Sequence, residues 1–433
     1  MPRMKVAVVG AGKMGLPLAC QFARRGARVT ACDSSPDRVE AIRRGESPID
    51  EPGVPELLAE LVRDGQISAT GDTASAAGAS EVVVVIVPAL LTAERDIDAS
   101  ALQAASREIA RSLRPGVLVS YETTVPVGGT RRLLLPVLEQ SGLRAGHDFD
   151  LVFSPERVKS GGVLENLQHH PKVVGGHTTS AGRRAAEFYR RFLGAPVIDV
   201  GSLEAAELVK LAGMAYRDVN IALANELARY SEAIGLDMTA LIDAVNTDGE
   251  AALLRPGIGV GGHCTPVYPY FLIRDAQRRS VELGLTERSR AINDDQARHT
   301  LDRLDRHLGG LSGAPVLILG LGFRPGVKEH AFSPAFLLRD ELLRRDARVT
   351  LHDPLYDTHE IEQHGFTAGS LEDDPPPRAV ILNTAHDDYL DLDFAELARN
   401  GVRTVVDGRN VWDPDAVREA GLSYLGVGRP DRL

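Results

Sequence analysis

The sequence predicts an α/β fold made of two doubly wound parallel-sheet domains joined by a long central helix. Continuous apolar runs, typical of strands buried on both faces, alternate with helical stretches near both ends of the chain. A proline-free helical segment separates the two regions. At 433 residues the chain is too long for one ordinary core, so two or three domains are expected.

The N-terminal region alternates strands and helices. Residues 4–9 (MKVAVV) predict a buried strand, and a helix over 16–26 leads to a second strand at 28–33. Further strands are expected at 81–87, 116–122 and 150–154. We therefore expect one doubly wound domain over residues 1–198.

The middle of the chain changes character at Ser202. From there to about Leu236 the sequence has helical periodicity, with Ser202 as the N-cap candidate and Gly235 as the candidate for the helix end. A helix of about 30 residues more often joins two domains and forms a dimer contact than lies within one sheet. Helical periodicity continues to about residue 305, which predicts a central helical region over 199–305.

The strand–helix alternation restarts in residues 306–433. A helix is expected over 334–346, and strands at 316–323, 348–354, 379–385 and 404–410. The segment GLGF at 320–323 lacks a complete glycine fingerprint. We expect this domain to bind something other than a dinucleotide, or nothing.

Composition excludes several classes of protein. The net charge of −11 argues against a nucleic-acid binder. The three cysteines include no CxxC pair, which excludes a disulfide framework and a cysteine-based zinc site and fits a reducing cytosol. The N-terminus has no signal-peptide layout, and no segment approaches the ~20 apolar residues of a membrane helix. We expect a cytoplasmic protein that holds no metal.

A dinucleotide fingerprint follows the first strand. Gly10, Gly12 and Gly15 open a helix directly after it, and Asp33 closes the next strand. GxGxxG alone is a weak signal, but this context makes it specific for a Rossmann-like domain. Asp33 would bind the ribose hydroxyls and repel a 2′-phosphate, so the expected cofactor is NAD rather than NADP. The cofactor-binding candidates are Gly10, Gly12, Lys13, Met14, Gly15, Asp33 and Thr124.

Cys264 stands in GVGGHCTPVYPYFL, residues 259–272, behind glycines and ahead of prolines. The segment alone leaves two readings open, a nucleophile that a substrate approaches closely and a packed structural thiol. A nicotinamide cofactor indicates a dehydrogenase, and a dehydrogenase with a poised cysteine can oxidise twice. The thiol traps an aldehyde as a thiohemiacetal, a second hydride leaves, and water cleaves the thioester.

Several longer motifs occur in an order that resembles one known family. They are GAGKMGLPLA, SPIDEPGVPELL, TTVPVGGT, SPERV, KLAGMAYRDVNIALANELA, GVGGHCTPVYPYFL and VVDGRNVWD. In this order they are similar to UDP-glucose/GDP-mannose dehydrogenases, and GGHC and YRDVNIA are closest to the UDP-N-acetylmannosamine dehydrogenase branch. The resemblance implies two Rossmann-like domains joined by a long helix, NAD as cofactor, a homodimer or larger oligomer, and four-electron oxidation of a sugar primary alcohol to a carboxylate.

The resemblance also implies roles for four residues. Cys264 matches the family's catalytic thiol, and a helix starting near Pro269 would help to stabilise its thiolate. Lys210 matches the lysine that stabilises the developing oxyanion; otherwise it is a solvated helix lysine. Glu156 matches a carboxylate that handles protons; otherwise it forms a surface salt bridge. Thr124 matches the threonine that orients a water; otherwise it is a turn residue.

Four positions depart from the family pattern. Met214 replaces an asparagine one helical turn after the lysine, and Tyr268 replaces an aspartate four residues after the cysteine. Glu250 and Ala331 each replace an arginine that recognises the substrate diphosphate. Bidentate arginine contacts to a diphosphate are strong and specific, so these two changes oppose a standard nucleotide diphosphate in the standard pose.

Three functions remain open on the sequence. The first is NAD-dependent oxidation of a nucleotide sugar, of the UDP-hexose or UDP-N-acetylhexosamine type, to the carboxylate through a thioester on Cys264. The second keeps the dehydrogenase chemistry but changes the substrate to a sugar or nucleoside without the usual diphosphate, or stops before the acid. The third is an inactive NAD-binding paralogue. The lost arginines favour the second function and the intact motif order favours the first.

Overall fold

The computed structural model describes residues 3–431, and its internal contacts divide the chain into two compact units. The first unit runs to Gly213 and includes Tyr270–Ser280, whereas the second comprises Met214–Pro269 and the chain from Val281 onward. Within the described residues, no helix is long and apolar enough to cross a membrane.

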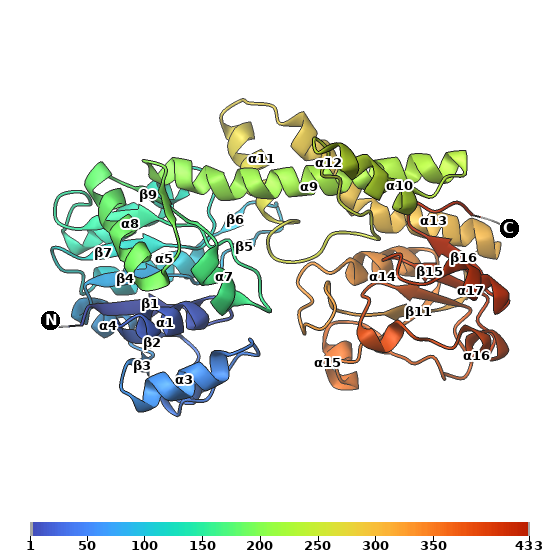
Figure 1. The fold of residues 1–433 in the computed structure, drawn as a ribbon, viewed down its shortest axis with the longest axis horizontal. Helices are drawn as coiled ribbons and strands as arrows, with labels where there is room; N and C mark the ends of the chain where they lie inside the picture. The colour runs from blue at the N-terminus through green and yellow to red at the C-terminus, as the bar shows by residue number, and fades with distance from the viewer. Residues whose placement is uncertain (1–2, 432–433) are drawn as a thin grey trace. The chain divides into compact units, whose positions relative to one another are not determined.

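Among the described residues, the first unit forms an eight-stranded sheet in the order β10-β9-β8-β7-β4-β1-β2-β3, with helices on both faces (Figure 1). Its strands are β1 (Lys5–Val9), β2 (Arg28–Cys32), β3 (Ile67–Thr70), β4 (Val82–Val85), β7 (Leu118–Tyr121), β8 (Asp150–Phe153), β9 (Lys172–Gly176) and β10 (Val197–Asp199). Its helices include α1 (Gly15–Arg24), α2 (Pro36–Arg43), α3 (Val54–Arg63), α4 (Thr73–Ala79), α5 (Ser100–Ala110), α6 (Leu135–Leu138), α7 (Val163–His169) and α8 (Thr179–Leu193). A short antiparallel hairpin, β5 (Leu90–Leu91) with β6 (Ile97–Asp98), lies outside the sheet.

The β1 strand shows why the first apolar run is continuous. Val6 and Val8 belong to one core cluster, and Ala7 and Val9 belong to another. Alternate side chains of a strand point to opposite faces, so both faces of this sheet are buried and both need apolar residues. The predicted doubly wound fold is confirmed.

One edge of this sheet departs from the parallel pattern. The β9 strand runs antiparallel to β8, pairing Gly176 with Val152 and Gly175 with Phe153. A Cβ on Gly175 would lie 1.9 Å from the backbone oxygen of Ser202, so only glycine fits there. Two glycines in a five-residue strand weaken its apolar signal, and the sequence analysis did not predict β9.

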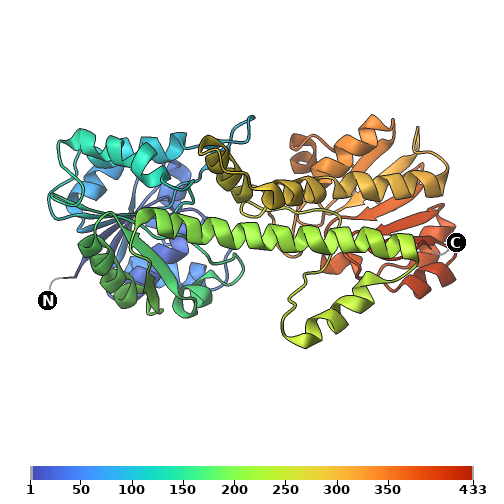
Figure 2. The same cartoon turned by 90° about the horizontal axis from the view of Figure 1, so that it is seen from above.

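The helix α9 (Leu203–Ile234) forms the long element expected from the sequence (Figure 2). The Ser202 hydroxyl accepts a hydrogen bond from the Ala205 amide at 3.2 Å, as an N-cap does. At the other end Gly235 has φ 77°, and the Leu236 amide donates to the Ser231 carbonyl at 2.9 Å. This is the glycine-ended Schellman arrangement, so both predicted ends are confirmed.

The described part of the second unit contains a six-stranded parallel sheet in the order β13-β12-β11-β14-β15-β16. Its strands are β11 (Pro315–Leu319), β12 (Arg348–His352), β13 (Thr367–Ala368), β14 (Ala379–Leu382), β15 (Thr404–Asp407) and β16 (Ser423–Gly426). Its helices after α9 include α10 (Met238–Val245), α12 (Gly284–Asp294), α13 (Gln296–Leu308), α14 (Pro334–Arg344), α15 (Thr358–Gln363), α16 (Phe394–Arg399) and α17 (Pro414–Glu419). Most of α11 (Tyr268–Arg278) belongs to the first unit. The short edge strands β13 and β16 were not predicted.

The second sheet repeats the backbone turn of the first. Gly10 has φ 101° and Gly320 has φ 97°, and each follows the first strand of its sheet. The Ala11 amide donates to Asp33 at 2.9 Å, and the Leu321 amide donates to Asp353 at 2.7 Å. The two sheets thus present the same glycine–carboxylate arrangement.

Candidate active site

The cofactor turn in the first unit needs its glycines for different reasons. A Cβ on Gly10 would lie 2.8 Å from the Ile86 carbonyl oxygen, and one on Gly15 would lie 1.8 Å from the Gly10 oxygen. A Cβ on Gly12 would meet only open space. Gly10 and Gly15 are therefore required by packing, whereas Gly12 leaves backbone that a ligand can approach.

The helix α1 begins at this turn with its amides directed outward. Met14 at its N-cap provides no side-chain hydrogen bond, and no acidic residue lies in the first turn. Backbone N–H groups at a helix N-terminus favour an anion, and the pyrophosphate of a dinucleotide is such a group. Lys13 and Met14 are half-buried beside it.

Asp33 follows β2, as predicted, and its carboxylate is held by neighbours. One oxygen accepts from the Ala11 amide at 2.9 Å and the other from the Ser35 amide at 3.0 Å. Arg38, which the sequence analysis missed, donates from Nη1 to both oxygens at 3.1 Å. This carboxylate, together with the open backbone at Gly12 and the uncapped helix, fits a dinucleotide with free ribose hydroxyls.

In the second unit the same crevice is filled by the protein's own side chains. Asn383 donates to the carbonyl oxygens of Gly320 at 2.9 Å and Gly322 at 3.1 Å. His386 Nε2 lies 3.3 Å from Asp353, the counterpart of Asp33. The carbonyls and the carboxylate at this turn are therefore engaged by side chains of the second unit itself.

Lys210 lies on α9 and is not a solvated helix lysine. Its residue is only 7% exposed, and Nζ donates to the Glu156 backbone oxygen at 2.6 Å. This hydrogen bond joins the SPERV segment, which contains Glu156, to the helix α9. It also fixes the position of the Lys210 side-chain nitrogen.

Glu156 is not on the surface either. Its Oε1 accepts from the Val158 amide at 2.6 Å, and its Oε2 lies 3.6 Å from Lys172 Nζ. Burial acts to raise the pKa of Glu156, but the Lys172 ammonium, the Val158 amide and Lys210 together outweigh it, and the net shift is downward. The carboxylate is therefore ionised at neutral pH and able to accept a proton.

Thr124 is buried in the loop that follows β7. Glu207 of α9 anchors this loop, because its carboxylate accepts from the Gly128 amide at 2.5 Å and the Thr130 amide at 2.8 Å. Burial raises the pKa of Glu207 to about 7. Lys210, Glu156, Thr124 and the cofactor turn accordingly belong to the first unit.

Several buried charged residues of this unit escaped the sequence analysis. Glu51 accepts from the amides of Gly161 and Val163, each at 2.9 Å, and so holds the chain that follows SPERV. Glu122 and Lys172 form an ion pair in which both side chains are buried. The available signal was a charged residue directly beside an apolar strand, as in SYE at 120–122.

Cys264 belongs to the second unit and carries a half-buried free thiol. It precedes α11 by four residues, and the Tyr268 amide donates to its carbonyl oxygen at 2.9 Å. The expected helix near Pro269 is therefore present. Cys20 and Cys32 are buried, which raises the pKa of each thiol to about 12 and leaves them unreactive.

The glycines before Cys264 serve packing inside the second unit. A Cβ on Gly261 would lie 2.4 Å from Phe323 Cβ. Gly262 has φ 99°, and its amide donates to the Ala331 carbonyl at 2.8 Å. Gly261 and Gly262 therefore let the loop pack closely against the chain that follows β11.

The positions that depart from the family pattern differ in their surroundings. Met214 and Tyr268 are half-buried, whereas Glu250 is exposed on the segment after α10. Ala331 contributes its backbone oxygen to Gly262 and has no polar side chain to offer a ligand.

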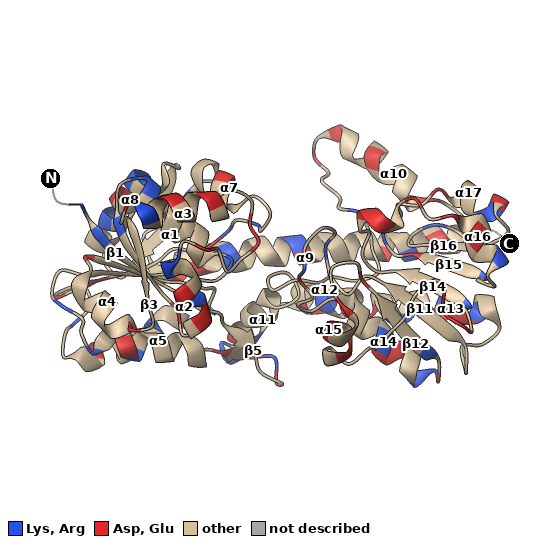
Figure 3. Ribbon diagram, turned by 90° about the horizontal axis from the view of Figure 1, so that it is seen from below, with Lys and Arg blue, Asp and Glu red and all other residues tan. Residues whose placement is uncertain are grey.

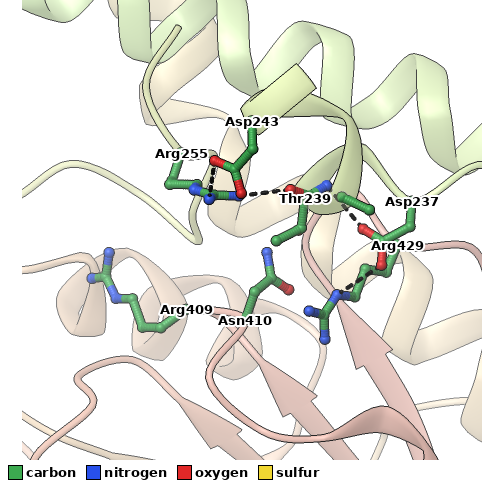
Figure 4. Close-up of a pocket in the computed structure, with 8 residues that line it drawn as sticks. Asp237, Thr239, Asp243, Arg255, Arg409, Asn410 and Arg429 are labelled. Atoms are coloured by element: carbon green, nitrogen blue, oxygen red, sulfur yellow. Dashed lines mark hydrogen bonds and ion pairs between the residues drawn. The ribbon is translucent and has the colours of Figure 1, made fainter. Parts of the chain in front are cut away.

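A cavity of about 380 Å³ lies in the second unit beside α10 (Figure 4). Its lining is Asp237, Thr239, Ala240, Asp243, Arg255, Arg409, Asn410 and Arg429. Arg255 pairs with Asp243 at 2.6 Å and Arg429 with Asp237 at 3.3 Å. Burial lowers the pKa of Arg409 to about 10, so this guanidinium remains charged.

Three domain profiles of one family match the chain. They are the NAD binding domain of the UDP-glucose/GDP-mannose dehydrogenase family over residues 4–193, the central domain over 204–295 and the UDP binding domain over 317–414.

Similar proteins cover the whole chain. A UDP-N-acetyl-D-mannosamine dehydrogenase of Pyrococcus horikoshii is 30% identical, covering 99% of this chain and 100% of its own. A UDP-glucose 6-dehydrogenase of Rhizobium meliloti is also 30% identical, with coverage of 99% and 100%.

Solved structures agree in fold. The structure of the UDP-D-ManNAc dehydrogenase from Pyrococcus horikoshii superposes with a TM-score of 0.91 at 30% identity, covering 99% of this chain and 100% of that one. An NDP-N-acetyl-D-galactosaminuronic acid dehydrogenase from Methanosarcina mazei Go1 gives 0.86 at 31% identity, with coverage of 99% and 96%. With a nucleotide-binding turn that fits NAD and family profiles along most of its length, this chain belongs to the UDP-glucose/GDP-mannose dehydrogenase family and is an NAD-dependent oxidoreductase.

Proposed function

We propose that the protein oxidises the primary alcohol of a nucleotide sugar, of the UDP-hexose or UDP-N-acetylhexosamine type, to the carboxylate. The observation that carries the proposal is the buried contact between Lys210 and Glu156 in the unit that carries the NAD turn. A fixed cation close to an ionised carboxylate is the pair of groups that alcohol oxidation needs, and this supports the proposal. The named relatives support the substrate class.

The chemistry divides among the chain's own residues. NAD, when bound, supplies the hydride acceptor for both oxidations. Lys210 stabilises the alkoxide that forms as the alcohol loses its proton, and later the oxyanion of the tetrahedral adduct. Glu156 takes a proton from the hydrolytic water, which Thr124 orients.

Cys264 carries the intermediate of the second oxidation. Its thiolate adds to the aldehyde carbon, forming a C–S bond, and loss of a hydride converts the thiohemiacetal to a thioester. Water then adds, the C–S bond breaks and the thiolate leaves. In total one water is consumed and two NAD are reduced. The N-terminus of α11, four residues after Cys264, supports the thiolate.

A second candidate function changes the substrate. Ala331 and Glu250 offer no guanidinium, and the cavity beside α10 sets three arginines against two aspartates. A diphosphate carries more negative charge than the remaining positive excess can balance. These observations favour a sugar or nucleoside without the usual diphosphate. Failure of every UDP-sugar, with NAD still bound, would select this candidate.

The oligomer and the domain roles are part of the same proposal. Tyr216, Leu223 and Tyr230 stand seven residues apart on α9 and are 63%, 48% and 63% exposed. Such a stripe is typical of a helix–helix contact, so we propose a homodimer formed through α9.

We assign NAD to residues 1–198, dimerisation and Cys264 to 199–305 and the substrate nucleotide to 306–433. Because the mechanism needs a free thiol, we place the protein in the cytoplasm.

The test is NADH release from purified protein with UDP-glucose and UDP-N-acetylmannosamine, with products identified by mass. We expect two NADH per substrate and a product that gains one oxygen and loses two hydrogens. Cys264→Ser should abolish acid formation and permit at most one hydride transfer. Unaltered acid production by Cys264→Ser would exclude the thioester route.

A further inference from the structure

A cluster of ionisable side chains lies buried behind Glu156. Glu122 directly follows β7, Lys172 begins β9 and Tyr189 belongs to α8. Their residues are 0%, 6% and 0% exposed. Nothing in the proposed chemistry uses them, although buried charges are costly and need a reason.

Hydrogen bonds connect the cluster closely. Lys172 Nζ lies 2.5 Å from Glu122 Oε2, and the Tyr189 hydroxyl donates to Glu122 Oε1 at 2.7 Å. Ser120 Oγ lies 2.8 Å from the same hydroxyl. Both Glu122 oxygens therefore have partners inside the protein.

Lys172 also faces Glu156. Its Nζ lies 3.6 Å from Glu156 Oε2, and the Glu156 amide donates to the Glu122 carbonyl at 3.2 Å. One ammonium is thus shared by two carboxylates. Lys210 approaches from α9 on the far side, where it binds the Glu156 backbone oxygen.

The charges of this triad do not balance when all three groups are ionised. Within the triad of Glu122, Lys172 and Glu156, two carboxylates and one ammonium sum to −1, and one bound proton makes these three groups neutral. Lys210 adds a positive charge next to Glu156, outside the triad. Burial raises the pKa of Glu122 to about 7, against the opposing effect of Lys172, whereas the pKa of Glu156 is lowered. The proton of the triad is therefore held by Glu122 rather than Glu156, and it is lost as the pH rises through about 7, while Glu156 stays ionised.

A small cavity adjoins two members of the triad. It measures about 20 Å³ and is lined by both Glu156 and Lys172. That volume holds about one water molecule. Arg157 and the exposed His170 also line it and complete the charged or titratable groups on this side.

We propose that Glu122 and Lys172 are positioning residues which keep Glu156 ionised as the base and compensate each proton that it takes. The inference rests on the proposed role of Glu156. When Glu156 takes a proton from water, the neutral triad gains a positive charge. Lys172 then gives a proton to a water molecule from solvent that enters the cavity and carries the proton away, and it receives the proton of Glu122, so that the triad is neutral again. No oxidant or further reactant is required.

The test is the pH dependence of kcat for acid formation in the full-length enzyme. In the parent we expect activity to fall above pH ~7, because Glu122 then holds no proton to release. Glu122→Gln should lose this inflection and show a plateau lowered about tenfold. Lys172→Met should move the acidic limb, which reports Glu156, upward by about one pH unit or more, whereas Lys172→Arg should leave it in place.

Two further variants separate a failure of the triad proposal from a failure of the proposed role of Glu156. Tyr189→Phe removes one hydrogen bond to ionised Glu122 and should move the inflection near neutrality to higher pH, even if a charge variant fails to fold. Glu156→Gln tests the proposed function itself, with an expected loss of about 100-fold. Full activity of Glu156→Gln would overturn the role of Glu156. An impaired Glu156→Gln beside unshifted profiles for Lys172→Met and Tyr189→Phe would overturn the triad alone.

Discussion

At the scale of single residues, we expect nucleotide selectivity to depend on Asp33, whose carboxylate is held in place by its neighbours. Backbone amides hold both of its oxygens, and Arg38 lies 3.1 Å from each. The carboxylate is therefore fixed before any nucleotide binds, and its charge is directed at the position of the ribose hydroxyls in a dinucleotide. Arg38 is restrained by the same carboxylate.

Replacing Asp33 should accordingly change two things at once. Asp33→Ala removes the ribose acceptor and releases Arg38, which can then approach a 2′-phosphate. We expect NAD affinity to fall about tenfold, or ~1.4 kcal/mol, while NADP affinity falls less or rises. Calorimetric titration with both nucleotides measures this. Asp33→Asn is the matched control, because it keeps the shape while removing the charge. Equal losses for NAD and NADP would contradict the assignment.

Some site residues could be predicted from the sequence and others could not. Asp33 belongs to a local strand–turn–helix motif, which is enough to predict it. The segment around Cys264 leaves two readings open, and only the order of motifs along the whole chain favours a nucleophile. Glu122 and Lys172 are 50 positions apart and become a pair only when β7 and β9 enter the same sheet. Their importance follows from burial, which single-residue patterns do not encode.

At the scale of elements, the loop from Gly259 to Cys264 depends on close packing. Gly261→Ala would place a Cβ 2.4 Å from Phe323 Cβ, so the loop must move. A displacement of ~1 Å near reacting groups costs about 100-fold in rate, and we expect kcat to fall by about that factor. NAD affinity should be unchanged, because the cofactor turn lies in the first unit.

The control for this loop variant is Gly284→Ala. A Cβ there meets nothing within 4 Å at the start of α12. It should leave both kcat and NAD affinity as in the parent. A parental kcat in Gly261→Ala would show that the loop tolerates displacement and that its glycines have another purpose.

Elements were predictable where one local pattern decides them. The ends of α9 follow from a serine cap and a glycine stop, and the central strands follow from apolar runs. The edge strands β3, β10, β13 and β16 are short or only partly buried, so their sequences carry little pattern. The antiparallel β9 depends on glycines that let α9 approach, which no strand pattern reveals.

At the scale of the whole molecule, charge and apolar surface are distributed unevenly. The net charge is −11, yet arginines gather on α8 (Figure 3). A stripe of exposed aromatic and aliphatic residues, Tyr216, Leu223 and Tyr230, runs along α9. Exposed apolar surface of this regularity marks an interface more often than a solvated helix face.

The dimer proposal therefore predicts a simple change of mass in solution. Tyr216→Glu with Leu223→Glu places like charges in the contact, and we expect light scattering to report a monomer where the parent is a dimer. Leu285→Glu is the control, because Leu285 is an exposed apolar residue (70%) outside α9. A dimer that persists in the double variant would place the interface elsewhere.

The three cysteines differ so much in their solvent exposure that the number of thiols open to alkylation distinguishes folded from unfolded chains. Cys20 and Cys32 are sealed in the core with thiols that stay protonated, whereas Cys264 is partly open to solvent. An alkylating reagent at neutral pH should add one label per folded chain, and unfolding should raise the count to three. The label number read by intact mass then reports the fraction of folded chains with a free Cys264 thiol in any preparation, without a substrate in hand.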